Sequence, residues 1–133
     1  MAIARKDSIM DKNEIKSVLQ TYFDACYECN GETMGSVFHN EAHIYGQSKD
    51  GTLTDWDRKS FMDMVDSCKP GTAIPGFSRL DEIISIDFTG ENAAVARVKV
   101  RVMNMVYTDI LSFLLLDGKW KIISKLFSGI PMV

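Results

Sequence analysis

A change of hydrophobic period at Arg79 is the feature of this sequence that most constrains its fold. Before this residue the apolar residues recur at helical spacing, and after it they alternate with polar residues as they do in β-strands. We expect four strands, over residues 79–88, 92–105, 106–116 and 119–127, joined by short turns. Short connections between long strands are typical of an antiparallel meander.

The first half of the chain predicts helices. Apolar residues at spacings of three and four indicate an amphipathic helix over residues 12–29, capped by Asp11 and ended by Asn30 and the glycine that follows it. A short helical segment, a strand pair over residues 42–54 and a third helix, capped by Asp55 and reaching about residue 67, are expected next.

Two of the predicted strands differ in the character of their faces. Val98 and Val100 alternate with Arg97 and Lys99, so the cations are expected on a solvated face. Residues 111–116, in contrast, are apolar on both faces except for one serine. Because the helices can cover only one side of the sheet, we expect a homodimer through its other face.

Composition narrows the class of protein. The 133 residues are enough for one domain, expected over residues 12–133 after a flexible lead-in over residues 1–11. A net charge of -3 without a basic run argues against a nucleic-acid partner, and no apolar run is long enough for a membrane span. Three cysteines without an export signal favour reduced thiols and a cytoplasmic location.

Cys26 and Cys29 form a Cys-x-x-Cys pair, a pattern shared by zinc sites and redox couples. The pair falls near the C-terminal end of its predicted helix, where the helix dipole does not stabilise a thiolate. A zinc site needs a second pair of ligands, and His39, His43 and Cys68 do not supply one. We therefore expect a structural pair, with no metal and no cofactor.

Two segments carry a resemblance to a known family. VLQTYFDACYECNGETMGSVFHNEAHIYG (residues 18–46) and DGKWKIISKLF (residues 117–127) resemble the opening and the closing strand of the nuclear transport factor 2-like superfamily. FHNEAHIYG followed by DGTL is most similar to its bacterial branch named for lumazine binding, which is related to ketosteroid isomerases and polyketide cyclases. The resemblance covers residues 12–128.

This resemblance implies an α+β fold of the cystatin-like kind. A cone-shaped, curved antiparallel sheet is expected to pack against three N-terminal helices around a hydrophobic cavity, with dimerisation through the outer face of the sheet. The doubly apolar strand read from the sequence agrees with this expectation.

The resemblance also suggests which chemistry to look for. Tyr22 matches the tyrosine with which ketosteroid isomerases stabilise an oxyanion, but their general base falls at or next to Gly46 and their second acid falls near Leu111. Isomerase chemistry is therefore not expected. Asp109 shares a strand face with Leu111, so it is either an acid facing the cavity or a carboxylate at an exposed strand start. If Gly46 points inward, His43 points away from the cavity.

The predicted ligand site combines two polar residues with an apolar wall. Its members are Tyr22, Phe38, Ile44, Trp56, Phe61, Asp109, Leu111 and Phe113. We expect it to bind a small hydrophobic or aromatic molecule, flat or polycyclic, unless bulky side chains such as Phe38, Phe61, Phe113 and Leu115 fill the space. No catalytic residue is assigned. The alternatives are a protein-interaction module and an enzyme of the isomerase, cyclase or dehydratase type.

Overall fold

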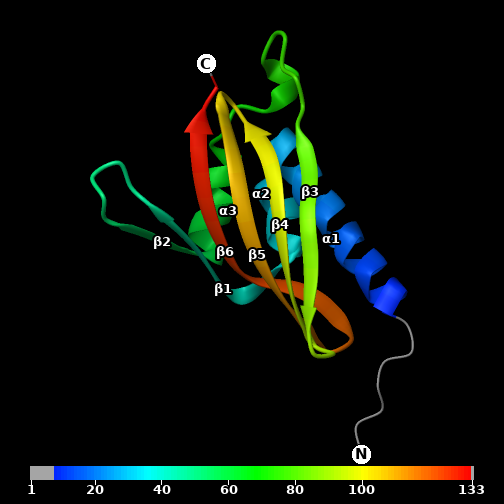
Figure 1. Ribbon diagram of the computed structural model, residues 1–133. Coiled ribbons are helices and arrows are strands. Elements are labelled where there is room, and N and C mark those ends of the chain that lie inside the picture. Colours follow the sequence, from blue (N-terminus) through cyan, green and yellow to red (C-terminus); the bar gives the residue numbers. More distant parts are fainter. Residues whose placement is uncertain (1–7, 133) are drawn as a thin grey trace, which may run out of the picture.

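The computed structural model describes residues 8–132, which form one curved sheet with helices against one of its faces (Figure 1). The helices are α1 (Ser8–Glu28), α2 (Gly31–Ser36) and α3 (Arg58–Asp66), with a single 3-10 turn η1 (Gly71–Ala73). The strands are β1 (Phe38–Gln47), β2 (Leu53–Asp57), β3 (Asp81–Thr89), β4 (Ala93–Val102), β5 (Met105–Leu116) and β6 (Lys119–Pro131). The expected α+β architecture, with its helices in the N-terminal half, is confirmed.

The strand order in the sheet is β2-β1-β6-β5-β4-β3. Strands β3 to β6 form the predicted antiparallel meander, in which, for example, Ala96 of β4 pairs with Leu111 of β5. One pairing was not predicted: β1 lies parallel to β6, with Ile44 opposite Lys125. Strands β1 and β2 form an antiparallel hairpin that extends as an arm beyond the rest of the sheet (Figure 1).

Helix α1 begins earlier than the sequence predicted. It starts at Ser8, so residues 8–11 of the expected lead-in are helical, while residues 1–7 lie outside the described residues. Asp11 is not the cap but a buried residue of the first turn, and its Oδ1 accepts a hydrogen bond of 3.1 Å from the indole N–H of Trp120. A buried indole N–H requires an acceptor, which explains why the helix extends across this end of the sheet.

Helix α3 begins later than predicted, because the cap is Asp57 rather than Asp55. The Asp57 carboxylate accepts a hydrogen bond of 2.8 Å from the backbone N–H of Ser60. Trp56, predicted at the start of a helix, lies in strand β2 opposite Ile44 of β1. Both aspartates are good cap residues, but strand β2 stays paired with β1 up to Asp57, so the helix begins only after this residue.

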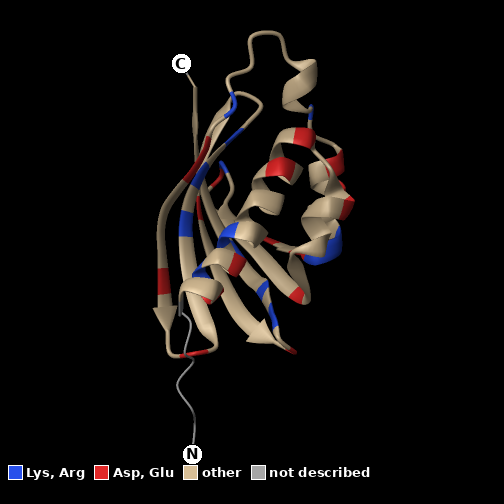
Figure 2. Ribbon diagram, turned by 90° about the vertical axis from the view of Figure 1, so that its right-hand side faces the viewer, with Lys and Arg blue, Asp and Glu red and all other residues tan. Residues whose placement is uncertain are grey.

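The helices and the inner face of the sheet enclose the core. Val98 and Val100 of β4 point into it, whereas Arg97 and Lys99 are exposed, as the alternation predicted. Figure 2 shows that all helices of the described part of the chain lie on one side of the sheet. No helix within residues 8–132 is long and apolar enough to span a membrane.

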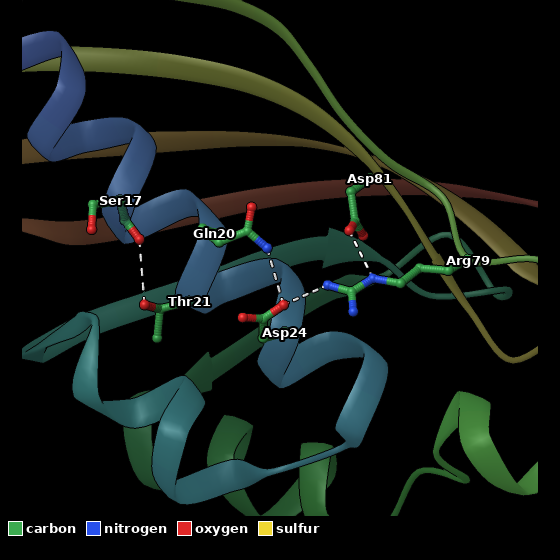
Figure 3. Close-up of polar contacts among 6 residues, drawn as sticks. All are labelled: Ser17, Gln20, Thr21, Asp24, Arg79 and Asp81. Carbon is green, nitrogen blue, oxygen red and sulfur yellow. Dashed lines mark hydrogen bonds and ion pairs between the residues drawn. The ribbon is translucent and has the colours of Figure 1, made fainter.

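An ionic network fastens α1 to the beginning of β3. Arg79 donates to Asp24 of α1 at 2.6 Å and to Asp81 of β3 at 2.8 Å, and Gln20 also donates to Asp24 (Figure 3). These hydrogen bonds, led by the one from Arg79, lower the pKa of the Asp24 carboxyl. The Arg79 guanidinium also lies over the ring of Tyr27, 4.6 Å from its centre. The network orients the edge of the sheet against the first helix.

Candidate functional site

A partly open cavity of about 170 Å³ lies between the helices and the inner face of the sheet. Its wall is mostly aromatic, aliphatic and sulfur-containing. The lining residues are Cys26, Cys29, Met34, Trp56, Phe61, Met64, Val65, Cys68, Val100, Val102, Met103, Asn104, Met105, Tyr107, Asp109, Lys125 and Phe127. Asp109 and Lys125 are the two charged members of this set.

Asp109 is fully buried and forms the polar end of the cavity with two neighbours. Its Oδ2 accepts a hydrogen bond of 2.5 Å from the hydroxyl of Tyr22, which is also fully buried. The Nζ of Lys125 lies 3.7 Å from the same oxygen. The other carboxylate oxygen, Oδ1, is buried without a hydrogen-bond partner among residues 8–132. Of the two placements that the sequence left open for Asp109, the structure has the inward one.

Tyr22 acts toward Asp109 as a hydrogen-bond donor. Burial, together with the nearby Asp109 carboxylate, raises the pKa of the Tyr22 phenol well above its usual value. The phenol therefore keeps its proton and donates a hydrogen bond to Asp109. Tyr22 was predicted as a member of the ligand site, but it is not among the lining residues, and its hydroxyl contacts Asp109 instead. Its role in the structure is to position the carboxylate.

Lys125 is a buried lysine surrounded by aromatic rings. Its side chain is only 10% exposed, and its Nζ lies 4.6 Å from the ring centre of Phe61, 5.2 Å from that of Tyr22 and 5.9 Å from that of Phe127. The electron-rich ring faces attract a cation at these distances. Lysine is rarely buried without a partner, and here Asp109 is that partner. Carboxylate and rings together hold the Lys125 nitrogen at the polar end of the cavity.

A β-bulge in β6 places Lys125 on the inner face. Ser112 of β5 pairs with Ser124, but the next residue, Phe113, pairs with Ile122, so the register skips Ile123. An extra residue reverses which side chains point inward along the rest of the strand. Trp120 and Ile122 are buried before the bulge, and Lys125 is buried after it. Simple alternation from Trp120 assigns Lys125 to the outer face, which is why sequence reasoning missed it.

Phe127 occupies the space above Gly46. A Cβ built on Gly46 overlaps the Phe127 ring, so no side chain fits there while the ring keeps its place. Trp56 stacks on Phe127 with ring centres 5.9 Å apart, and it also stacks on Phe61 at 6.5 Å. An aromatic wall therefore fills the space at Gly46, at or next to which the resemblance to ketosteroid isomerases puts a general base.

The eight residues of the predicted site fall into two groups. Trp56, Phe61 and Asp109 line the cavity, and Tyr22 supports Asp109 from behind. The other four are buried core residues that do not line it, namely Phe38, Ile44, Leu111 and Phe113. Their side chains fill part of the cone, which limits the remaining space.

Several lining residues were not predicted, and one candidate lies elsewhere. Lys125 and Phe127 escaped because the bulge in β6 has no simple sequence signal, whereas Tyr107 shares its strand face with Asp109 and could have been found by that alternation. His43 lies on the outer face of β1, where its Nδ1 is 2.7 Å from the Asp55 carboxylate. It therefore takes no part in the cavity.

The three cysteines lie along the cavity wall as free thiols. Burial raises the pKa of Cys26 to about 12 and that of Cys29 to about 11, and it raises the pKa of Cys68 as well. A redox couple or a metal site needs the thiolate, whereas these thiols are protonated at neutral pH. Within residues 8–132, no group of three or more histidine, cysteine or acidic side chains is arranged to hold a metal ion.

Replacing Gly46 by alanine is expected to force the Phe127 ring out of its stack with Trp56. Crowding of this kind costs roughly 1–3 kcal/mol in the free energy of unfolding, which urea denaturation measures. The matched control is Gly46→Ala in a Phe127→Ala background, where the clash is absent and the substitution is expected to cost much less. Equal costs in the two backgrounds would contradict this packing.

The raised pKa values predict slow alkylation of the cysteines. At pH 8, iodoacetamide should modify Cys26, Cys29 and Cys68 more slowly in the folded protein than in guanidinium, and the rate should rise with pH because only the thiolate reacts. Mass spectrometry of the digested protein reports each cysteine separately. A Cys26 or Cys29 that reacts faster in the folded protein would indicate a stabilised thiolate and overturn the structural interpretation.

Comparisons with known proteins identify the fold family. A crystal structure of an NTF2-like protein of unknown function from Shewanella baltica OS155 is 25% identical with a TM-score of 0.85, and the match covers 96% of this chain and 99% of that one. A second NTF2-like protein of unknown function, from Methylobacillus flagellatus KT, is 31% identical with a TM-score of 0.83, covering 97% and 99% of the two chains.

Two comparisons of sequence extend this result. A curated protein from Cladobotryum sp. named Aldolase FrzH is 28% identical over 122 residues, which are 90% of this chain and 94% of that protein. The model of the family described as "Putative lumazine-binding" matches residues 10–128. The match spans both segments on which the sequence resemblance rested, from the first helix to the closing strand. The chain therefore belongs to this family, "Putative lumazine-binding", among the NTF2-like proteins.

Proposed function

We propose that the cavity binds a small, flat, largely apolar molecule whose one polar group meets Asp109 and Lys125. The family and the NTF2-like neighbours indicate a small-molecule-binding domain. The observation that carries the finer proposal is the second oxygen of Asp109, which is buried at the cavity wall without a hydrogen-bond partner in the described part of the chain. A ligand donor at this oxygen would complete the site.

The energetics of burial favour such a ligand. A buried acceptor without a partner destabilises a protein by about 1–3 kcal/mol, and more when the acceptor is charged. Among residues 8–132 no donor reaches Asp109 Oδ1, and most of the wall consists of rings, methionines and aliphatic side chains. A molecule that fills the cavity and donates to Oδ1 gains from both contacts, since it also buries apolar surface against Trp56 and Phe61.

The size of the cavity limits the ligand. At about 170 Å³ it is smaller than the pockets of roughly 300–1,000 Å³ that hold drug-sized molecules. The wall also contains parallel rings, Phe61, Trp56 and Phe127, which suit a planar partner. We therefore favour a molecule of one or two rings over a larger polycyclic one.

Isomerase chemistry of the ketosteroid type is not part of this proposal. The resemblance puts its general base at or next to Gly46, and the Phe127 ring leaves no space for a side chain at Gly46. An interaction module is disfavoured for a different reason: a buried ion pair at the end of a cavity contributes nothing to recognition of a protein on the surface.

Binding can be tested with two flat probes, lumazine and 2-naphthol. We expect isothermal titration calorimetry to detect both, and Asp109→Asn and Tyr22→Phe each to weaken 2-naphthol by roughly 1–3 kcal/mol, the usual cost of a disturbed buried hydrogen bond. Thr108→Val, on the outer face of the same strand opposite Lys99, is the matched control and should leave affinity unchanged. If calorimetry detects binding of neither probe, the proposal is refuted.

We also propose a homodimer through the outer face of the sheet. Leu126 and Ile130 of β6 are 50% and 66% exposed on that face, and Ile110 of β5 lies beside Leu126. No helix of residues 8–132 covers this side, so a second copy would bury these side chains (Figure 2). Three free thiols are also in keeping with the proposed cytoplasmic location.

Analytical ultracentrifugation at micromolar concentration should give the mass of a dimer. Leu126→Glu would place two buried charges in the interface and is expected to yield monomers. Ile9→Glu is the control, because Ile9 is 71% exposed on α1, away from the outer face. A wild-type protein that sediments as a monomer would contradict the proposed interface.

A further inference from the structure

We infer that Lys125 is a covalent nucleophile, which forms a Schiff base with a small apolar aldehyde or ketone in the cavity. The inference rests on the proposed ligand site and names the chemical class of its substrate. It goes beyond binding because the polar end of the cavity holds the Lys125 amine next to Asp109. One oxygen of this carboxylate, Oδ2, can accept a proton, and the other, Oδ1, has no hydrogen-bond partner among residues 8–132.

The position of Lys125 fits this role. Lys125 is one of the residues that line the cavity, and its Nζ lies beside the buried Asp109 carboxylate, so a ligand at the polar end comes close to the amine. Among residues 8–132 it is the only buried lysine, whereas Lys59 on α3 has a side chain 79% exposed. Lysines that carry Schiff bases in proteins lie in such desolvated, apolar pockets. The carbonyl of a flat ligand stacked against Trp56 and Phe61 would face this nitrogen.

Asp109 can supply the proton transfers that the reaction needs. Its Oδ2 lies 3.7 Å from Nζ, and once the ligand has closed this gap to hydrogen-bond distance, the oxygen takes a proton from the Lys125 ammonium and leaves a neutral amine. The nitrogen lone pair attacks the carbonyl carbon, the C=O π electrons move to oxygen, and a proton passes from nitrogen to that oxygen to give a carbinolamine. Asp109 then returns its proton to the hydroxyl group, which leaves as water while the nitrogen lone pair forms the C=N bond.

The surroundings of Lys125 accommodate the product as well as the reactant. The ammonium becomes an iminium and Asp109 ends as the carboxylate it was, so the site has the same net charge before and after. The rings of Phe61 and Tyr22, which lie 4.6 and 5.2 Å from Nζ, attract either cation. Tyr22 remains bonded to Asp109 throughout, because its raised pKa keeps the phenol protonated.

A purely structural ion pair explains less of the geometry. Buried ion pairs contribute little to stability compared with apolar side chains of similar volume. Such a pair also gives no reason for a carboxylate oxygen without a partner beside a cavity. Both features are expected of a site in which Asp109 exchanges a proton with bound substrate and water. The relative from Cladobotryum that bears the name of an aldolase is in keeping with a carbonyl substrate.

Reductive trapping tests the inference directly. The full-length protein is incubated with benzaldehyde and cyanoborohydride, digested, and analysed by mass spectrometry for benzylated lysines. We expect Lys125 to be labelled at least about tenfold faster than the exposed Lys59, because the cavity holds aldehyde and amine together. Excess 2-naphthol should slow labelling of Lys125 but not that of Lys59.

Two variants of Lys125 distinguish its amine from its charge, because methionine removes both and arginine keeps only the charge. Lys125→Met and Lys125→Arg should both abolish the fast labelling, whereas Lys59→Met should preserve it. If either Lys125 variant fails to fold, the 2-naphthol competition in the wild-type protein decides alone. Labelling of Lys125 no faster than that of Lys59, or labelling insensitive to 2-naphthol, overturns the inference. If calorimetry detects the probes in that case, the binding function stands and only the covalent step fails.

Discussion

The bulge at Ile123 of β6 is the constraint on which the candidate site depends. By skipping one residue in the register with β5, it turns Lys125 and Phe127 inward and Leu126 outward. A regular ladder would do the opposite and place a leucine beside Asp109. The charged end of the cavity and an exposed leucine on the outer face therefore have one cause.

The consequences of the bulge reach the neighbouring strand. Because Lys125 lies opposite Ile44 of β1, the next inward residue of β6, Phe127, comes to lie over Gly46. The ring then continues the stack that Trp56 and Phe61 begin. A larger residue at position 46 would break this arrangement. The aromatic wall and the absence of a general base at Gly46 are thus two descriptions of the same packing.

Most of the fold was predictable because it follows from periodicity. The meander of β3 to β6 and the alternation in β4 came directly from apolar residues at every second position. Asp109 and Leu111 were expected on the same strand face, and the structure buries both, but the sequence left open whether that face lines the cavity. These features depend on local patterns that a sequence displays.

The errors have a common origin in tertiary contacts. Trp56 was assigned to a helix because Asp55 is as good a cap as Asp57, and only the pairing with β1 distinguishes them. The early start of α1 depends on the hydrogen bond between Asp11 and Trp120, which are far apart in the chain. Lys125 was missed because a bulge in the middle of an apolar strand leaves no glycine or proline to mark it.

A crystal structure at a resolution that defines side-chain oxygens and bound solvent would test the central claim most directly. The account predicts that Lys125 lies inside the cavity next to Asp109, and that density for a ligand or an ordered water lies within hydrogen-bond distance of Asp109 Oδ1. A regular β6 that carries Lys125 on the outer face, with Leu126 turned into the cavity, would contradict it.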